Sequence, residues 1–416
     1  MNTSLHATTP EHATESLFPG AGRRCFLLGI GGCGMSGLAR MLLHRGAVVS
    51  GVDMQRSDFT DRLIADGVSV MTEDAPGAPP TAIPDDAELV IASAAIRPDH
   101  PLMLAAQRRG LPTLTYAEAL GRCMIGRTGI ALAGTHGKST TAAMLGFALA
   151  EAGLDPTVIV GATCAQLAGT DDRTRATGFR LGADRIPAGR LAGQPGALIA
   201  EACEFNRSFH NLHPTIASIS SVEADHLDIY GTLDAVIESF RDFARRVPAA
   251  DRGGRLIIAH EGAHRREVTA GVQAEVQTIG FSPAADFSIA FDPEARVVDL
   301  AFEGEQIAAW TLKLPGEHMA FNSALAAALA FTLGADPERI GEALSRFRGV
   351  DRRVQFLGDV GGVRVWDDYG HHPTEIEATL RALRQFERPE DRGGRIICVF
   401  QPHQHSRTRF LLEEFA

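Results

Sequence analysis

The chain has 416 residues, of which 45% are hydrophobic and 22% are charged. This is a globular composition, and the chain is too long for one ordinary core, so we expect two or three domains. The formal net charge of −11 disfavours a nucleic-acid partner, and no apolar run reaches the roughly 20 residues that span a bilayer, so we expect no membrane insertion.

The six cysteines are widely spaced and form no CxxC pair, a pattern typical of reduced thiols in a cytoplasmic protein. Residues 1–20 lack the basic and apolar parts of a signal peptide, and we predict a flexible arm there. The sequence leaves the oligomeric state open.

A glycine-rich turn follows the first predicted strand. The strand covers residues 24–28, the turn GIGGCG covers residues 29–34, and after a helical pattern a second strand at 47–52 ends at Asp53. Strand, GxGxxG, helix, strand and acid is the arrangement that binds a dinucleotide diphosphate. With a further strand at residues 89–93, it predicts a Rossmann-like domain, with or without NAD. We place this domain at residues 21–128.

The stretch Gly134–Thr141 reads GTHGKSTT and lies between an apolar run and an Ala/Leu-rich helical pattern that continues to Ala152. Strand, glycine turn and helix make a phosphate cradle, in which backbone N–H groups face the anion and a hydroxyl beside the lysine can hold Mg²⁺. The chain has two lysines, Lys138 and Lys313, among 40 Lys and Arg residues. Retaining lysine in this loop favours a phosphate site.

The loop departs from a full Walker A motif, which has glycine where Leu132 stands. The alternative interpretation is a glycine turn capped by Thr135 or Ser139. We predict an ATP site.

Two further strands deliver acidic groups at their ends. The strand at residues 197–200 leads into Glu201, and the strand at 216–220 leads toward Asp225 and His226. Ligands of open parallel sheets bind beyond the carboxyl ends of the strands, so we expect these groups beside Lys138 and at a Mg²⁺ site. We predict that residues 165–196 form a long exposed loop. The central domain would cover residues 129–345, including a core helix that ends at Leu333.

The remaining residues, 346–416, are called the third segment below. We predict one strand that ends near Tyr369, a helix with a capping box at Thr374 and Glu377, and a second strand at residues 395–400. With two clear strands this α/β unit is incomplete. Adjacent histidines cannot easily turn to one metal ion from such a turn, so the histidine pairs here do not favour a zinc site.

Eight stretches in this order resemble the Mur ligase family: GIGGCGMSGLA, GTHGKSTT, EACE, EADHLDIY, GEHMAFN, DRRVQF, DDYGHHPTE and FQPHQHSRTR. The resemblance begins near Arg24 and runs to the last residue. It implies an α/β protein of three domains: a Rossmann-like domain for a UDP-sugar, a central P-loop domain for ATP, and a Rossmann-like C-terminal domain, incomplete here, that brings in an amino acid.

The resemblance also implies site residues. For the UDP-sugar these are Gly29, Gly31, Gly32, Gly34, Met35, Ser36, Asp53 and Ser93. For ATP they are Gly134, Thr135, His136, Gly137, Lys138, Ser139, Thr140, Asn322, Arg353 and Asp368. Ser139, Glu201 and His226 would hold Mg²⁺ or Mn²⁺, and His371 and Arg407 would lie near the amino acid. The residues implied in catalysis are Lys138, Glu201, His226, Arg353 and Asp368.

The sequence departs from the family pattern at two positions. Met319 stands where the family usually has asparagine, and Gln404 where many members have arginine. Some relatives use a carbamylated lysine beside a second metal ion, but no lysine lies between Lys138 and Lys313. The nucleotide contact near Met319 and a two-arginine clamp for the carboxylate are therefore in doubt.

The implied activity is ATP-dependent ligation of L-alanine to the lactyl carboxylate of UDP-N-acetylmuramate through an acyl phosphate. This reaction belongs to peptidoglycan precursor synthesis, and so to cell-wall growth, cell shape and division. The alternatives are a sister ligase that adds a recycled tripeptide to the same sugar, an NAD-dependent oxidoreductase built on the first domain, and a non-catalytic nucleotide-binding relative.

Overall fold

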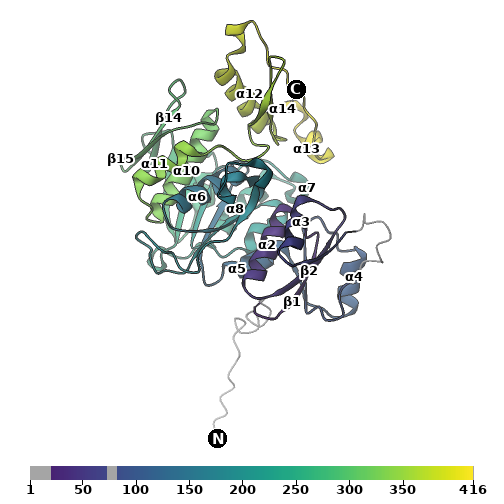
Figure 1. The fold of residues 1–416 in the computed structure, drawn as a ribbon. Coiled ribbons are helices and arrows are strands. Elements are labelled where there is room, and N and C mark those ends of the chain that lie inside the picture. Colours follow the sequence, from purple (N-terminus) through teal and green to yellow (C-terminus); the bar gives the residue numbers. More distant parts are fainter. Residues whose placement is uncertain (1–19, 73–81, 416) are drawn as a thin grey trace. The chain divides into compact units, whose positions relative to one another are not determined.

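The computed structural model describes residues 20–72 and 82–415. The predicted flexible arm, except for Gly20, lies outside the described residues. The chain divides into two compact units, one ending at Ile125 and the other beginning at Gly126, and each is treated by itself (Figure 1). Among the described residues, no helix combines the length and the apolar character that crossing a membrane requires.

The first unit is a parallel five-stranded sheet in the order β3-β2-β1-β4-β5. Its strands are β1 (Arg24–Leu28), β2 (Val48–Asp53), β3 (Ser69–Thr72), β4 (Leu89–Ala92) and β5 (Thr113–Thr115). Its helices are α2 (Cys33–His44), α3 (Asp58–Ala65), α4 (Pro101–Arg108) and α5 (Tyr116–Met124). This is the doubly wound order predicted from the glycine turn, and β1 is fully buried after its first residue.

The second unit contains a ten-stranded sheet in the order β15-β14-β13-β12-β11-β10-β6-β9-β7-β8. Its strands are β6 (Thr128–Ala133), β7 (Thr157–Cys164), β8 (Thr177–Arg180), β9 (Ala197–Glu201), β10 (Ile216–Ile219), β11 (Arg255–Ala259), β12 (Glu275–Gly280), β13 (Phe287–Asp292), β14 (Val297–Phe302) and β15 (Glu305–Thr311). Neighbours from β13 to β7 are parallel, and β8, β14 and β15 add antiparallel edges. Because β6 lies between β10 and β9, the three strand ends predicted to share an edge are adjacent.

The prediction of a long exposed loop at residues 165–196 is wrong in part. Thr177–Arg180 forms β8, which pairs antiparallel with β7 at the sheet edge, and Ile186 is buried in the main core. A four-residue strand amid Gly, Asp and Arg is too short to produce a recognisable alternation in sequence.

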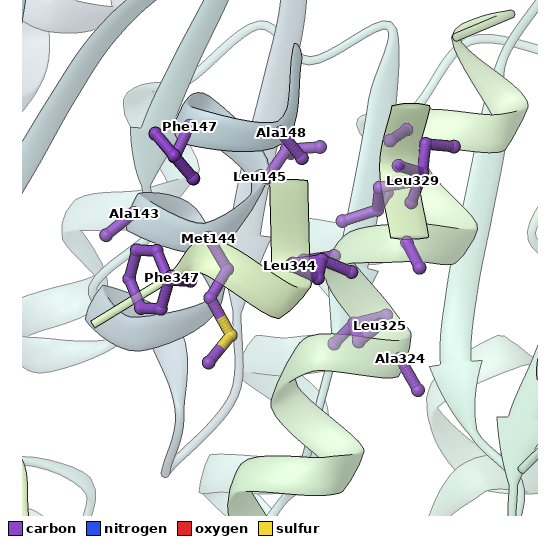
Figure 2. Packing of buried hydrophobic residues seen from close by; sticks show 14 of the residues in the cluster. Ala143, Met144, Leu145, Phe147, Ala148, Ala324, Leu325, Leu329, Leu344 and Phe347 are labelled. Carbon is purple, nitrogen blue, oxygen red and sulfur yellow. The ribbon is translucent and has the colours of Figure 1, made fainter. Parts of the chain in front are cut away.

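The core of the second unit depends on α6 (Lys138–Glu151) and α10 (Glu317–Thr332), with α11 (Pro337–Arg346) beside them. Figure 2 shows Met144 and Leu145 of α6 near Leu325 and Leu329 of α10 and Leu344 of α11. Both α6 and α10 are rich in alanine and buried on nearly every face, because small side chains let helices approach closely. The remaining α-helices of the central part are α7 (Leu227–Tyr230), α8 (Leu233–Ala244) and α9 (Arg265–Thr269).

Within the described residues, the third segment contributes an antiparallel hairpin and three α-helices. These elements are β16 (Gln355–Val360), β17 (Val363–Asp367), α12 (Pro373–Glu387), α13 (His405–Phe410) and α14 (Leu412–Phe415). The strand predicted at residues 395–400 is not formed, and Ile397 and Val399 are largely exposed there. A strand requires a hydrogen-bonded neighbour, and within the described residues β16 and β17 pair only with each other.

The capping box predicted at Thr374 and Glu377 is also wrong. The N-cap of α12 is His372, whose Nδ1 accepts the Thr374 backbone N–H, and the acidic partner is Glu375. Pro373 explains the shift, since its fixed φ and missing N–H suit the first helical position.

We predict that Leu325→Ala lowers the free energy of unfolding of the second unit by about 2–5 kcal/mol, because Leu325 is fully buried and its truncation leaves a cavity. Urea unfolding followed by tryptophan fluorescence measures this, since both tryptophans, Trp310 and Trp366, lie in this unit. Leu181→Ala, at a partly exposed position, is the control, and equal losses for the two variants would contradict the packing described here.

Candidate active site

The phosphate loop, Gly134–Thr141, connects β6 to α6, and two glycines give it its shape. Gly134 has φ 135° and Gly137 has φ 84°, a region that side-chain-bearing residues rarely adopt. A Cβ on Gly137 would lie 2.4 Å from Oδ1 of Asn322 on α10. The loop and the implied nucleotide-binding asparagine are therefore in direct contact.

Lys138 is the first residue of α6, and its ammonium lies at the mouth of the loop. Nζ donates to the carbonyls of Gly134 and Thr135 at 2.5 and 3.0 Å and lies 2.9 and 3.1 Å from the two carboxylate oxygens of Glu204. Burial favours the neutral amine, but Glu204 together with Cys203 and Glu201 raises the pKa of Lys138, so the side chain stays charged.

Glu201 and His226 each present a buried atom without a hydrogen-bond partner. Glu201 Oε2 accepts the Gly161 N–H at 3.0 Å, whereas its Oε1 and Nδ1 of His226 have no hydrogen-bond partner among the described residues. In addition, ligand atoms of Glu204, Asp225 and His226 lie within 4.8 Å of one another. Carboxylate oxygens are ligands that Mg²⁺ accepts, so the unpartnered Oε1 of Glu201 fits such an ion, whereas Glu204 and Asp225 are already paired with Lys138 and Arg407.

One cavity of about 590 Å³ joins these groups to the third segment. Of the residues implied for ATP, metal and amino acid, twelve line it: Thr135, His136, Gly137, Lys138, Ser139, Thr140, Glu201, His226, Asn322, Arg353, Asp368 and His371. Gly134 and Arg407 are not among its lining residues. Met319 also lines the cavity but is buried in the core, so no polar contact replaces the family's asparagine there.

Arg407, which the resemblance implies near the amino acid, makes a buried ion pair. Its Nε and Nη2 donate to Oδ1 and Oδ2 of Asp225 at 2.9 and 3.1 Å, and its Nη1 donates to the His403 carbonyl. Burial alone would raise the pKa of Asp225, but Arg407 and His226 hold it below its ordinary value. The pair connects α13 to the segment before α7, so the Arg407 guanidinium is already paired with a protein carboxylate in this conformation.

His371 faces the cavity, and burial lowers its pKa.

His136 connects the phosphate loop to the third segment. Its Nδ1 donates to Glu375 at 3.1 Å and its Nε2 to Glu223 at 3.3 Å. Burial opposes protonation, but these two hydrogen bonds and their charges raise the pKa of His136 to about 9. Thr374 adds a hydrogen bond to Glu223 at 2.8 Å.

His136, Glu223 and His372 also meet the spacing of a metal site. However, Nδ1 of His372 accepts the Thr374 N–H, so the proton of the neutral ring is on Nε2, which faces the Ala224 carbonyl at 3.4 Å. That ring offers no lone pair to a metal ion, and we interpret the group as a hydrogen-bonded cluster.

Arg353 and Asp368 lie where the third segment begins. Asp368 accepts the N–H groups of Val354 at 2.7 Å and Gly370 at 2.6 Å, and burial raises its pKa. Val354 has φ 46°, an unfavourable conformation for a β-branched residue, and the hydrogen bond from its N–H helps to hold it. The Arg353 guanidinium lies 3.9 Å from Glu375 and over the Tyr369 ring.

Sequence reasoning missed Glu204, Glu223 and Glu375 as site residues. Each stands in a stretch that had been singled out, namely EACE, EADHLDIY and DDYGHHPTE. The signal was an acidic residue in the same short stretch as one already chosen, but the acid that lies beside a cation in space cannot be identified from spacing alone.

The glycine turn of the first unit is a separate candidate site. Gly29 has φ 75°, the Gly31 N–H donates to Oδ2 of Asp53 at 2.8 Å, and a Cβ on Gly29 would lie 3.0 Å from Cβ of Ser93. Gly34 lies against Tyr116, where a Cβ would be 2.8 Å from the phenol oxygen. The turn, Asp53 and Ser93 thus gather at one sheet edge.

The other residues implied for the UDP-sugar occupy the start of α2. Gly32 is its N-cap, and Met35 and Ser36 are buried inside the helix. The Ser36 hydroxyl donates to the Cys33 carbonyl at 2.9 Å.

The His136 cluster predicts a pH-dependent stability. A group whose pKa is about 9 when folded and 6.5 ordinarily contributes fully below 6.5 and loses that contribution as pH rises through 9. We predict that the stability advantage of the wild type over His136→Gln falls by about 3 kcal/mol between about pH 6 and about pH 10. Urea unfolding at the two pH values measures it, and an unchanged difference would refute the assignment.

Three models of one family match the chain in order. "Mur ligase family, catalytic domain" matches residues 26–128, "Mur ligase middle domain" matches 132–330 and "Mur ligase, glutamate ligase domain" matches 352–416. A protein of Kineococcus radiotolerans named UDP-N-acetylmuramate–L-alanine ligase is 41% identical over 94% of this chain and 78% of its own length. One of the same name from Alkaliphilus metalliredigens is 35% identical over 94% and 79%.

Solved structures give the same result for the fold. The UDP-N-acetylmuramate-alanine ligase of Thermotoga maritima is similar with a TM-score of 0.70 and 25% identity, over 93% of this chain and 83% of that one. A murein peptide ligase of Psychrobacter arcticus has a TM-score of 0.71 at 24% identity, over 93% and 82%, and at that identity it shows the fold alone. With its three-part α/β architecture, its phosphate loop and these matches, the chain belongs to the Mur ligase family.

Proposed function

We propose that this chain is a UDP-N-acetylmuramate–L-alanine ligase, which joins L-alanine to the lactyl carboxylate of the UDP-sugar with hydrolysis of ATP to ADP and phosphate. The observation that carries the proposal is the shared cavity, in which the phosphate loop, Glu201, His226 and the third segment meet. The curated relatives of that name, matched over 94% of this chain, support the choice of substrates. The product would serve peptidoglycan synthesis in the cytoplasm.

The phosphate loop is suited to hold the triphosphate of ATP. Backbone N–H groups at the start of α6 face the cavity, and Lys138 supplies a positive charge where negative charge accumulates during phosphoryl transfer. Ser139, Glu201 and His226 would hold Mg²⁺, which offsets charge on the phosphate oxygens when it is bound. The unpartnered oxygen of Glu201 supports this assignment.

The reaction needs activation because a carboxylate is a poor electrophile. The lactyl carboxylate attacks the γ-phosphorus, and the bond from that phosphorus to the β,γ-bridging oxygen breaks. ADP is released, and the UDP-sugar now carries an acyl phosphate. The neutral amine of L-alanine then attacks the acyl carbon, and phosphate departs as the amide forms. The third segment, which lines the cavity through Arg353, Asp368 and His371, would exclude water from the acyl phosphate.

The parts of the chain divide this work among them. Residues 21–128 would bind the UDP-sugar at the glycine turn with Asp53 and Ser93, residues 129–345 would bind ATP, and residues 346–416 would bring in L-alanine near His371 and Arg407. Because Arg407 is paired with Asp225 in this conformation, contact with the L-alanine carboxylate would require that ion pair to open or to be shared.

We predict that Lys138→Ala lowers ATP turnover at least about a hundredfold, because it removes the positive charge that would offset negative charge on the transferred phosphoryl group. UDP-sugar binding, measured by calorimetry, is expected to remain within about twofold, since that site lies in the other unit. The chain offers a matched control in Lys313→Ala, which changes its other lysine at an exposed position. Unchanged turnover in Lys138→Ala would disprove the assignment.

We predict that ADP release with UDP-N-acetylmuramate depends on L-alanine and not on the recycled tripeptide. A coupled ADP assay with each acceptor measures this. Turnover with the tripeptide alone would favour the sister ligase, and a nicotinamide absorbance change without ATP would favour an oxidoreductase.

A further inference from the structure

Glu375 lies in the first turn of α12, and its two carboxylate oxygens have different partners. Oε2 accepts the backbone N–H groups of His371 at 3.0 Å and His372 at 3.3 Å, which caps the helix. Oε1 accepts the hydrogen bond from His136 Nδ1 at 3.1 Å, and Arg353 Nη1 lies 3.9 Å from it. One carboxylate therefore joins the start of α12 to the phosphate loop.

This contact is between charged groups. The Glu375 side chain is 15% exposed, and although burial raises its pKa, the hydrogen bond and charge of His136 hold the pKa far below its ordinary value. Charge-assisted hydrogen bonds in a buried setting are stronger than neutral ones. Glu223 faces the other ring nitrogen of His136, so the imidazolium is fixed from two sides.

The backbone at His136 is held by the central part of the unit alone. Its N–H donates to Oγ of Ser221 at 3.0 Å, and its carbonyl accepts from Oγ of Ser220 at 2.5 Å. The side chain is thus the part of His136 that contacts the third segment. The next residue, Gly137, is the N-cap of α6 and shares a rigid peptide plane with His136. A change in the position of His136 would therefore also move the Gly137 N–H and the phosphate-binding N–H groups that follow it.

We propose that Glu375 is a positioning residue that couples docking of the third segment to the geometry of the phosphate loop, acting through the side chain of His136. The third segment would thereby promote ATP binding as well as cover the cavity. The kinetic part of this inference rests on the proposed function, and the binding part does not.

The test is Glu375→Gln, measured by ATP affinity and by ligation kinetics. Glutamine retains a carbonyl oxygen that can cap α12, so the thermal midpoint is expected to stay within a few degrees while the charged contact with His136 is lost. We expect ATP affinity to fall about tenfold and the KM for ATP to rise, with the KM for UDP-N-acetylmuramate unchanged. Glu377→Gln, which removes an exposed carboxylate paired with Arg381 on the same helix, is the matched control and is expected to behave as wild type.

His136→Gln leaves the α12 cap untouched and is expected to weaken ATP binding to a similar degree. The double variant should bind ATP no more weakly than the weaker-binding single variant, because both substitutions remove the same contact. An ATP affinity of Glu375→Gln within twofold of wild type, or additive losses, would overturn the proposal. If Glu375→Gln does not fold, wild-type affinity in His136→Gln would overturn it. If the wild type releases no ADP with L-alanine, the proposed function fails while these affinities still decide the coupling.

Discussion

The candidate active site depends on the fixed position of the first turn of α6. That helix is buried on nearly every face against the sheet, α10 and α11, and its alanines allow a close approach (Figure 2). The same contact presses Asn322 against Gly137. Because the packing fixes the helix start, its N–H groups and Lys138 are placed before any ligand arrives, which is the preorganisation that the proposed phosphoryl transfer would require.

Charge is arranged around this turn in pairs that link different parts of the unit. Lys138 faces Glu204, His136 faces Glu223 and Glu375, and Arg407 faces Asp225. The contacts of His136 with Glu375 and of Asp225 with Arg407 connect the central part to the third segment. The third segment is therefore attached to the site by buried charged contacts, and these would have to rearrange if the cavity opens to admit substrates or the amino acid.

The sequence predicted the parallel strands around the site, because continuous apolar runs ending in Gly, Asp or Glu identify buried strands directly, but it did not predict β3, β5, β11, β12 or β13. The strands β1, β4, β6, β9 and β10 and their delivery of Lys138, Glu201 and His226 to one edge follow from that pattern. It could not supply β8, which is too short for a period, or the real cap of α12, where Pro373 shifts the helix start. The strand expected at 395–400 fails because pairing is a tertiary property. The partners of Glu204, Glu375 and Arg407 were likewise not predictable, since they depend on distances between segments more than 60 residues apart.

The central claim is that the lactyl carboxylate of UDP-N-acetylmuramate attacks the γ-phosphate of ATP at the phosphate loop. It is tested most directly by supplying the UDP-sugar with ¹⁸O in that carboxylate, together with ATP and L-alanine, and analysing the released phosphate by mass spectrometry. An acyl phosphate transfers one carboxylate oxygen to phosphate, so the phosphate should carry one ¹⁸O atom. Unlabelled phosphate accompanying amide formation would contradict the mechanism.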